Sequence, residues 1–230
     1  MMGKKLLALL LCGALLVTVL AACGAPEEKE VSAEQDSQPV ETEKEPDTGD
    51  ASLDNPRNQD GIGEKELLVV SFGTSYNDSR RLTIGAIENA MEEAFPEYAV
   101  RRGFTSQIII DHVKSRDNVA IDNVKQALDR AVENGVKTLV IQPTHLMDGL
   151  EYHELVDEVA QYSDAFEHLA IGKPLLTSEA DFQAVEQAIT EATAEYDDGK
   201  TAICFMGHGT EAASNAVYET PAGSVDPVWA

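Results

Sequence analysis

The sequence is poor in basic residues, in cysteine and in tryptophan. Its 17 lysines and arginines stand against 41 aspartates and glutamates, which gives a formal net charge of −24. A charge of this sign argues against nucleic acid as a partner and against adsorption to anionic lipid head groups. The chain has only three cysteines and one tryptophan, so it is not a cysteine-dense, disulfide-stapled scaffold.

The N-terminal 23 residues have the layout of a bacterial lipoprotein signal. Two lysines precede an apolar run that ends in Leu20-Ala21-Ala22-Cys23, which resembles a lipobox. We expect residues 1–22 to be a cleaved signal peptide and Cys23 to carry a lipid on the extracytoplasmic face of the cell membrane. An uncleaved transmembrane anchor is the alternative, but the run is short for a span. With Cys12 removed and Cys23 lipidated, Cys204 has no disulfide partner, and its apolar neighbours predict a core position.

Residues 23–63 form the second segment of the chain. They are rich in Glu, Asp, Pro and Ser and contain almost nothing apolar to bury. Such a segment cannot offset its ordering entropy. We therefore expect a disordered acidic tether that joins the lipid to the folded part, with calcium capture disfavoured because no EF-hand spacing occurs.

Short apolar runs alternate with helical periodicities from residue 64 onward. Strands are expected at 66–72, 98–104, 138–142, 168–172 and 201–207, the second nearer an edge because it is less apolar. Helices are expected between them, with Asn77 or Asp78, Asp122 and Ser178 as caps and Gly135 at a helix end. This pattern predicts an α/β fold with a parallel sheet and helices on both faces.

Ligands of such sheets bind at the carboxyl ends of the strands. Gly73 follows the first strand but stands in no nucleotide-binding pattern, so a tight turn and a ligand loop remain equal alternatives. His145 follows the third strand, with Glu151 six residues later, and this pair suits a borderline divalent metal. His208 follows the fifth strand between two glycines that let a bulky ligand approach. A metal-binding or acid/base cluster of His145, Glu151 and His208 is therefore predicted, whereas His153 is expected to face solvent.

Five ordered blocks carry a family resemblance: LLVVSFGTSYNDSR, GFTSQIII, PTHLMDGLEY, GKPLLTS and FMGHGTE. Together they resemble the anaerobic sirohydrochlorin cobaltochelatases, the CbiK type of class II tetrapyrrole chelatase. The resemblance implies a two-lobed chelatase fold that inserts Co²⁺ into sirohydrochlorin for cobalamin, with Fe²⁺ or Ni²⁺ as other candidate metals and no organic cofactor. It also leaves open an exported carrier that binds a tetrapyrrole, haem or a metal without inserting it.

The same resemblance assigns roles to particular residues. His208 is implied as the metal ligand and proton acceptor, and Glu151 as the residue that tunes metal preference. The turn formed by Ser71, Phe72, Gly73, Thr74, Ser75 and Tyr76, together with His145, is implied to line the tetrapyrrole pocket.

The C-terminal residues depart from the family pattern. Residues 64–200 match a complete first lobe, whereas residues 201–230 only begin the second, and ETPAGSVDPVWA no longer resembles it. We expect a truncated second lobe, which lacks a further metal-binding histidine. Its first strand would then have to pack on the first lobe, form a homo-oligomer or leave apolar surface exposed.

Overall fold

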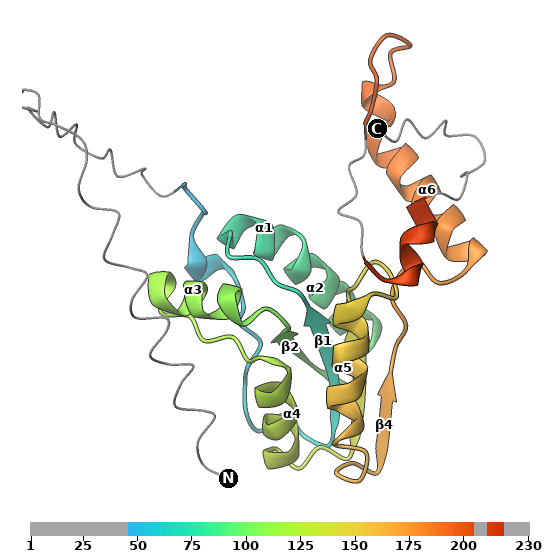
Figure 1. The fold of residues 1–230 in the computed structure, drawn as a ribbon. Coiled ribbons are helices and arrows are strands. Elements are labelled where there is room, and N and C mark those ends of the chain that lie inside the picture. Colours follow the sequence, from blue (N-terminus) through green and yellow to red (C-terminus); the bar gives the residue numbers. More distant parts are fainter. Residues whose placement is uncertain (1–45, 205–210, 219–230) are drawn as a thin grey trace, which may run out of the picture. The chain divides into compact units, whose positions relative to one another are not determined.

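Four parallel strands form the sheet of the computed structural model (Figure 1), which describes residues 46–204 and 211–218. They are β1 (Lys65–Ser71), β2 (Ala99–Phe104), β3 (Thr138–Pro143) and β4 (His168–Ile171), in the order β2-β1-β3-β4. The chain moves from β1 to β2 on one side and then crosses over to β3 and β4. This order creates a topological switch point between β1 and β3, where the loops after the two strands diverge.

The helices alternate with the strands as the sequence predicts. They are α1 (Asn77–Leu82), α2 (Ile84–Ala94), α3 (Gln107–Asp117), α4 (Val124–Glu133), α5 (Leu150–Ala160) and α6 (Glu179–Thr193). Three short 3-10 turns, η1 (Ala51–Leu53), η2 (Ala194–Tyr196) and η3 (Ala213–Tyr218), lie near the two ends of the described chain. The α/β class and the parallel sheet are confirmed.

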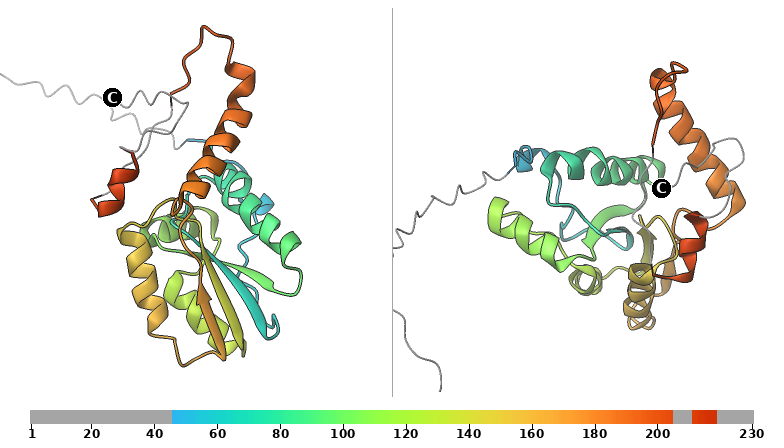
Figure 2. Two further views of the ribbon diagram at one scale, coloured as in Figure 1. Left: turned by 90° about the vertical axis from the view of Figure 1, so that its right-hand side faces the viewer. Right: turned by 45° about the horizontal axis from the view of Figure 1, so that its top comes forward.

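The two faces of β1 enter two separate cores. Leu68 and Val70 pack with Leu128 of α4 and Leu155 of α5 in the larger cluster. Leu67 and Val69 belong to a second cluster that Met91 of α2 partly covers. Figure 2 shows α1 and α2 on one side of the sheet and α4 and α5 on the other. Because β1 is buried on both faces, its sequence is a continuous apolar run rather than an alternation.

Local sequence accounts for several helix boundaries. Gly135 has φ +72° directly after α4, which confirms its expected place at the helix end. Ser178 accepts a hydrogen bond from the backbone N–H of Asp181, which confirms it as the cap of α6. Asp122 was expected to cap α4, but the cap is Asn123, which forms a capping box with Gln126.

The single helix expected after β1 is two helices. Thr83 separates them, and its hydroxyl donates to the carbonyl of Ser79 at 2.7 Å. A β-branched residue that bonds back to the preceding turn competes with regular helix hydrogen bonding. The expected caps are also wrong, because the N-cap is Tyr76 and no side-chain hydrogen bond caps the helix.

The expected tether does not extend to residue 63. Residues 46–63 belong to the folded unit, and Arg57 is only 3 % exposed although it lies in this acidic segment. Its guanidinium donates to Asn89 and Glu92 of α2. Hydrogen bonds and ion pairs with residues far along the chain hold this segment in place. It is therefore ordered although it has few apolar residues to bury. Residues 1–22, which we expect to be a signal peptide, Cys23 and residues 24–45 lie outside the described residues.

The fifth strand is absent from the part that the structure describes. Residues 201–204 have no strand pairing and all four are exposed. Cys204 is therefore exposed rather than buried, because no strand or helix among the described residues covers this segment. Residues 205–210, which include His208, lie outside the described residues. Among the helices described, none is both long and apolar enough to span a bilayer.

Candidate functional site

Hydrogen bonds join the carboxyl ends of the strands at the switch point. The backbone N–H of Thr144 donates to Val70 at 2.8 Å, and its hydroxyl donates to the hydroxyl of Ser71 at 2.8 Å. On the other side of β1, the N–H of Thr105 donates to the carbonyl of Ser71 at 2.9 Å. Ser71 is thus fixed between the loops that follow β2 and β3, and it is only 2 % exposed.

The loop at residues 71–76 presents aromatic side chains beside this junction. Phe72 is 53 % exposed and Tyr76 is 48 % exposed. Between them, Gly73 has φ +102°, and a Cβ there would lie 2.5 Å from the ring of Phe104. Only glycine satisfies both constraints. The tight turn therefore explains the glycine, and the same turn leaves two aromatic rings partly exposed.

His145 begins the loop on the β3 side of the switch point. Both of its ring nitrogens are buried, and neither has a hydrogen-bond partner among the described residues. Burial lowers its pKa, and the negative charge of Glu151 acts in the opposite direction. The imidazole is therefore neutral at pH 7, the form that can bind a metal or accept a proton. Its backbone is held by the N–H of Leu175, which donates to the His145 carbonyl at 3.0 Å.

Glu151 lies in the first turn of α5, after Gly149 as the N-cap. The next residue, Tyr152, donates its hydroxyl hydrogen to the carbonyl of Gly172 at 3.2 Å. This bond ties the start of α5 to the segment that follows β4. The predicted pair of His145 and Glu151 is therefore placed at the same edge of the sheet, and the electrostatic effect of Glu151 reaches the imidazole.

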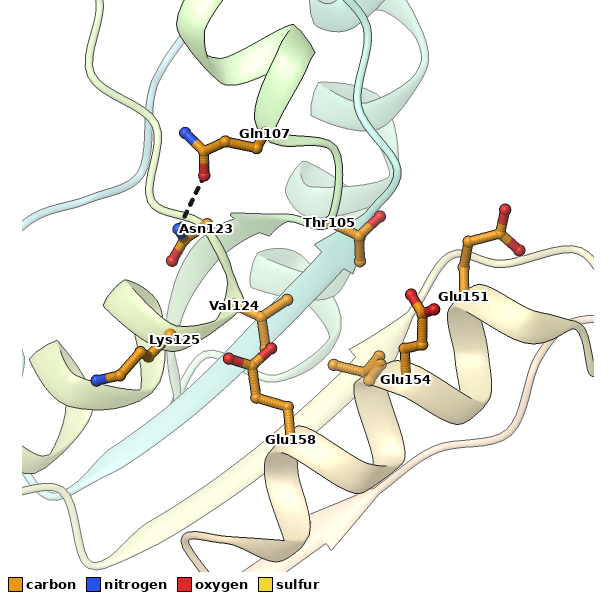
Figure 3. Close-up of a pocket in the computed structure, with 9 residues that line it drawn as sticks. Thr105, Gln107, Asn123, Val124, Lys125, Glu151, Glu154 and Glu158 are labelled. Atoms are coloured by element: carbon orange, nitrogen blue, oxygen red, sulfur yellow. Dashed lines mark hydrogen bonds between the residues drawn. The ribbon is translucent and has the colours of Figure 1, made fainter. Parts of the chain in front are cut away.

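A shallow acidic hollow of about 170 Å³ lies beside Glu151. Glu154 and Glu158 line it from the same face of α5, and Thr105 and Lys125 line it from the opposite side (Figure 3). Burial raises the pKa of Glu158, which the charge of Lys125 partly counteracts. Glu151, Glu154 and Glu158 are spaced at i, i+3 and i+7, which places them on one face of a helix. This spacing could have predicted the acidic surface, but the sequence analysis did not use it.

The other predicted histidines have different surroundings. His153 is exposed and pairs with Asp148 at 2.8 Å, as expected for a solvent-facing residue. His208, the implied metal ligand, lies outside the described residues. Within residues 46–204 and 211–218, no group of three or more His, Cys, Asp and Glu side chains is arranged to hold a metal ion.

Exposed aliphatic side chains also surround the strand ends, and sequence reasoning missed them. Leu146 and Leu150 follow β3, Leu175 follows β4, and Ile108 lies in the first turn of α3. Ile108 is the most exposed of these four residues, at 83 %. These residues and the two aromatic rings give the edge of the sheet an apolar rim, which suits a large flat ligand.

Comparisons with known proteins place the chain among the cobalt chelatases. The family model for cobalt chelatase (CbiK) matches residues 65–223. Over 155 residues, the chain is 36 % identical to the sirohydrochlorin cobaltochelatase of Salmonella typhimurium, covering 67 % of this chain and 58 % of that protein. Over 178 residues, it is 29 % identical to the sirohydrochlorin cobaltochelatase CbiKC of Nitratidesulfovibrio vulgaris, covering 76 % of this chain and 62 % of that protein.

The segment that matches the family model contains every strand of the sheet and both loops of the switch point. The alignments with the two relatives cover about three fifths of the length of those proteins. The residues that form the sheet, the switch point and the predicted site thus all fall inside one matched segment, and the chain belongs to the CbiK cobalt chelatase family.

Proposed function

We propose that this protein inserts Co²⁺ into sirohydrochlorin, the activity for which its relatives are named. The observation that carries the proposal is the matched segment, which includes a neutral His145 at the switch point that has no hydrogen-bond partner among the described residues. The aromatic rings of Phe72 and Tyr76 and the aliphatic rim support a flat tetrapyrrole as the ligand.

Metal insertion requires partial dehydration of the ion and removal of two protons from the pyrrole nitrogens. Imidazole and carboxylate groups suit both tasks, because they bind borderline divalent ions and accept protons near neutral pH. We assign His208 as metal ligand and proton acceptor, and Glu151 as the residue that tunes the charge and hydration of the ion. His145 would face the macrocycle in its neutral form. Fe²⁺ and Ni²⁺ are candidate alternative substrates of the same donor set, and no organic cofactor is part of the proposal.

The proposal includes an extracytoplasmic location. The lipobox-like sequence before Cys23 supports cleavage there and attachment of a lipid to the new N-terminus. Mass spectrometry of the mature protein would give an N-terminal Cys23 with acyl chains, and Cys23→Ala would abolish membrane association. An intact N-terminus at Met1 would contradict this part of the proposal.

The test of the activity uses the full chain with sirohydrochlorin and Co²⁺ under anaerobic conditions. We expect the absorption bands to shift as the cobalt complex forms, and we expect His208→Ala to abolish the shift. His145→Ala should slow it by roughly tenfold or more, an effect of one lost proton-transfer or binding group. His153→Ala is the matched control, because that histidine lies on α5 but is paired with Asp148 and exposed to solvent.

The outcomes distinguish a chelatase that inserts the metal from a carrier protein that only binds its ligand. A spectral change without metal insertion, such as tight binding of free sirohydrochlorin, would favour the carrier alternative. An equal rate for wild type and His208→Ala would exclude the assigned role of His208.

A further inference from the structure

Residues 46–60 form a strap along the edge of the sheet, although they lie before the segment that matches the family model. The carbonyl of Arg57 accepts a hydrogen bond from the N–H of Arg102 in β2 at 3.1 Å. The side chain of Gln59 donates to the carbonyl of Val100 in the same strand at 3.3 Å. The strap therefore covers hydrogen-bonding groups on the free edge of β2, which edge strands otherwise expose.

The backbone of Arg57 indicates that this arrangement is specific. Its φ is +49°, in the left-handed region that favours glycine. The residue keeps this conformation while its buried guanidinium contacts Asn89 at 2.7 Å and Glu92 at 2.9 Å on α2. A strained backbone persists only where the surroundings hold it, so the strap has a defined seat on α2 and β2.

The other end of the strap contacts the start of α1. The carbonyl of Thr48 accepts from the N–H of Asp78 at 2.9 Å, and the carbonyl of Gly49 accepts from the side chain of Asn77 at 3.1 Å. The first helical turn after the 71–76 loop is thus capped by the strap and not by its own side chains.

Asp54 links the strap to the loop itself. Its carboxylate accepts from Nε of Arg80 at 2.6 Å and from Nη1 of Arg102 at 2.7 Å. The same Arg80 donates through Nη1 to the carbonyl of Thr74 at 3.1 Å and through Nη2 to Asn77 at 2.6 Å. Asp54 and Arg80 are almost completely buried, at 3 % and 0 % side-chain exposure. The orientation of the guanidinium that holds Thr74 therefore depends on Asp54.

We propose that Asp54 is a positioning residue, and that the strap sets the shape of the 71–76 loop. In this chain, a segment outside the family match would then control the affinity of the site for its tetrapyrrole. The statement about the ligand rests on the proposed function, whereas the statement about loop order does not.

Asp54→Asn in the full-length protein tests the proposal. The change keeps the size of the side chain but removes the charge that orients Arg80. Asp122→Asn is the matched control, because Asp122 is also a buried carboxylate that pairs with two arginines, Arg101 and Arg130. Those contacts do not include the 71–76 loop. Both variants are expected to lower the unfolding temperature.

Two measurements distinguish loop positioning from general stability. In hydrogen exchange under native conditions, Asp54→Asn should speed exchange of the amides of residues 74–78 by about tenfold or more, whereas Asp122→Asn should not. In titrations with sirohydrochlorin alone, Asp54→Asn should weaken binding by roughly tenfold, with little change for the control.

Each result bears on a different statement. Equal exchange of residues 74–78 in both variants would overturn the positioning role of the strap, even if Asp54→Asn melts at a lower temperature. Faster exchange with unchanged sirohydrochlorin affinity would overturn the link to the ligand. If the wild-type protein does not bind sirohydrochlorin, the proposed function fails, while the exchange data still decide the positioning role.

Discussion

Two adjacent arginines of β2 enter opposite faces of the sheet and form two buried charge clusters with different protonation. Arg102 lies on the α2 side, where Glu88 and Asp54 contact it, and Arg101 lies on the α4 side with Glu66 and Asp122. We call these the Arg102 cluster and the Arg101 cluster. Both arginines are completely buried. The clusters therefore differ in the burial and hydrogen bonding of their carboxylates, not in the burial of their arginines.

The geometry of the hydrogen bonds contributes to the different pKa values of Asp54 and Glu66. Arg102 donates to Glu88 at 2.7 Å from two nitrogens and to Asp54 at 2.7 and 3.1 Å. Although burial would raise the pKa of Asp54, its hydrogen bonds with Arg102 and Arg80 keep that pKa below the ordinary value. This carboxylate is therefore ionised at neutral pH, as a buried charge that is well paired can be.

Glu66 is bonded less closely. One nitrogen of Arg101 contacts its two oxygens at 3.3 and 3.4 Å, while the other terminal nitrogen is directed to Asp122 at 2.9 Å. Burial raises the pKa of Glu66 to about 7, against the opposing charge of Arg101. Glu66 of the Arg101 cluster thus gains a proton near neutral pH, whereas Asp54 of the Arg102 cluster remains ionised.

The largest expected effect comes from removing each arginine. Arg102→Met leaves Asp54 and Glu88 buried with reduced compensation, and we expect a loss of about 3–5 kcal/mol in the free energy of unfolding. Arg101→Met should cost only about 1–2 kcal/mol, because Glu66 can take up a proton and Asp122 keeps Arg130. Urea unfolding of both variants at pH 6.5 measures the difference. Equal losses would show that the two clusters are not distinct.

The pH dependence of stability gives the next effect. The folded pKa of Glu66 is above its unfolded value, so its contribution is fully present below about pH 4.5 and is lost as the pH rises through about 7. Glu66→Gln removes this dependence. As the pH rises from 5 to 8, we expect the free energy of unfolding of the variant to increase by on the order of 2 kcal/mol relative to that of the wild type. Parallel stability curves for the two proteins over this range would contradict the raised pKa.

The two clusters also show what the sequence could predict. The strands and most helices follow from apolar runs and helical periodicity, since β1 reads as a continuous apolar run and β2 reads as less apolar and lies at an edge. Such patterns do not predict which polar residues pair with one another when they lie far apart in the sequence. Arg102 and Asp54 are 48 residues apart, and neither belongs to a motif. For this reason the ordered strap was expected to be part of a disordered tether.

The candidate site was predictable to a similar degree. His145 and Glu151 were expected at the carboxyl edge because strand ends converge there, and both are found at that edge. The aliphatic rim was not expected, because single apolar residues in loops such as Ile108 and Leu175 have no periodicity to reveal them. Nor could the sequence show that Asp54 supports the loop through Arg80, since that depends on a contact between distant segments.

The smallest effect on stability is expected for an exposed ion pair, which also joins a basic side chain to a carboxylate. Lys125 and Asp129 lie one turn apart on α4 and approach to 2.7 Å, with 65 % and 46 % of their side chains exposed. Hydrogen bonding to Asp129 raises the pKa of Lys125, yet solvent and salt screen such pairs and ordering two long side chains opposes them. Lys125→Met should therefore leave the urea midpoint unchanged within experimental error, at low salt and at 1 M salt alike. A loss comparable to that of Arg101→Met would mean that short contact distance, rather than burial with well-directed hydrogen bonds, decides how much these ion pairs contribute.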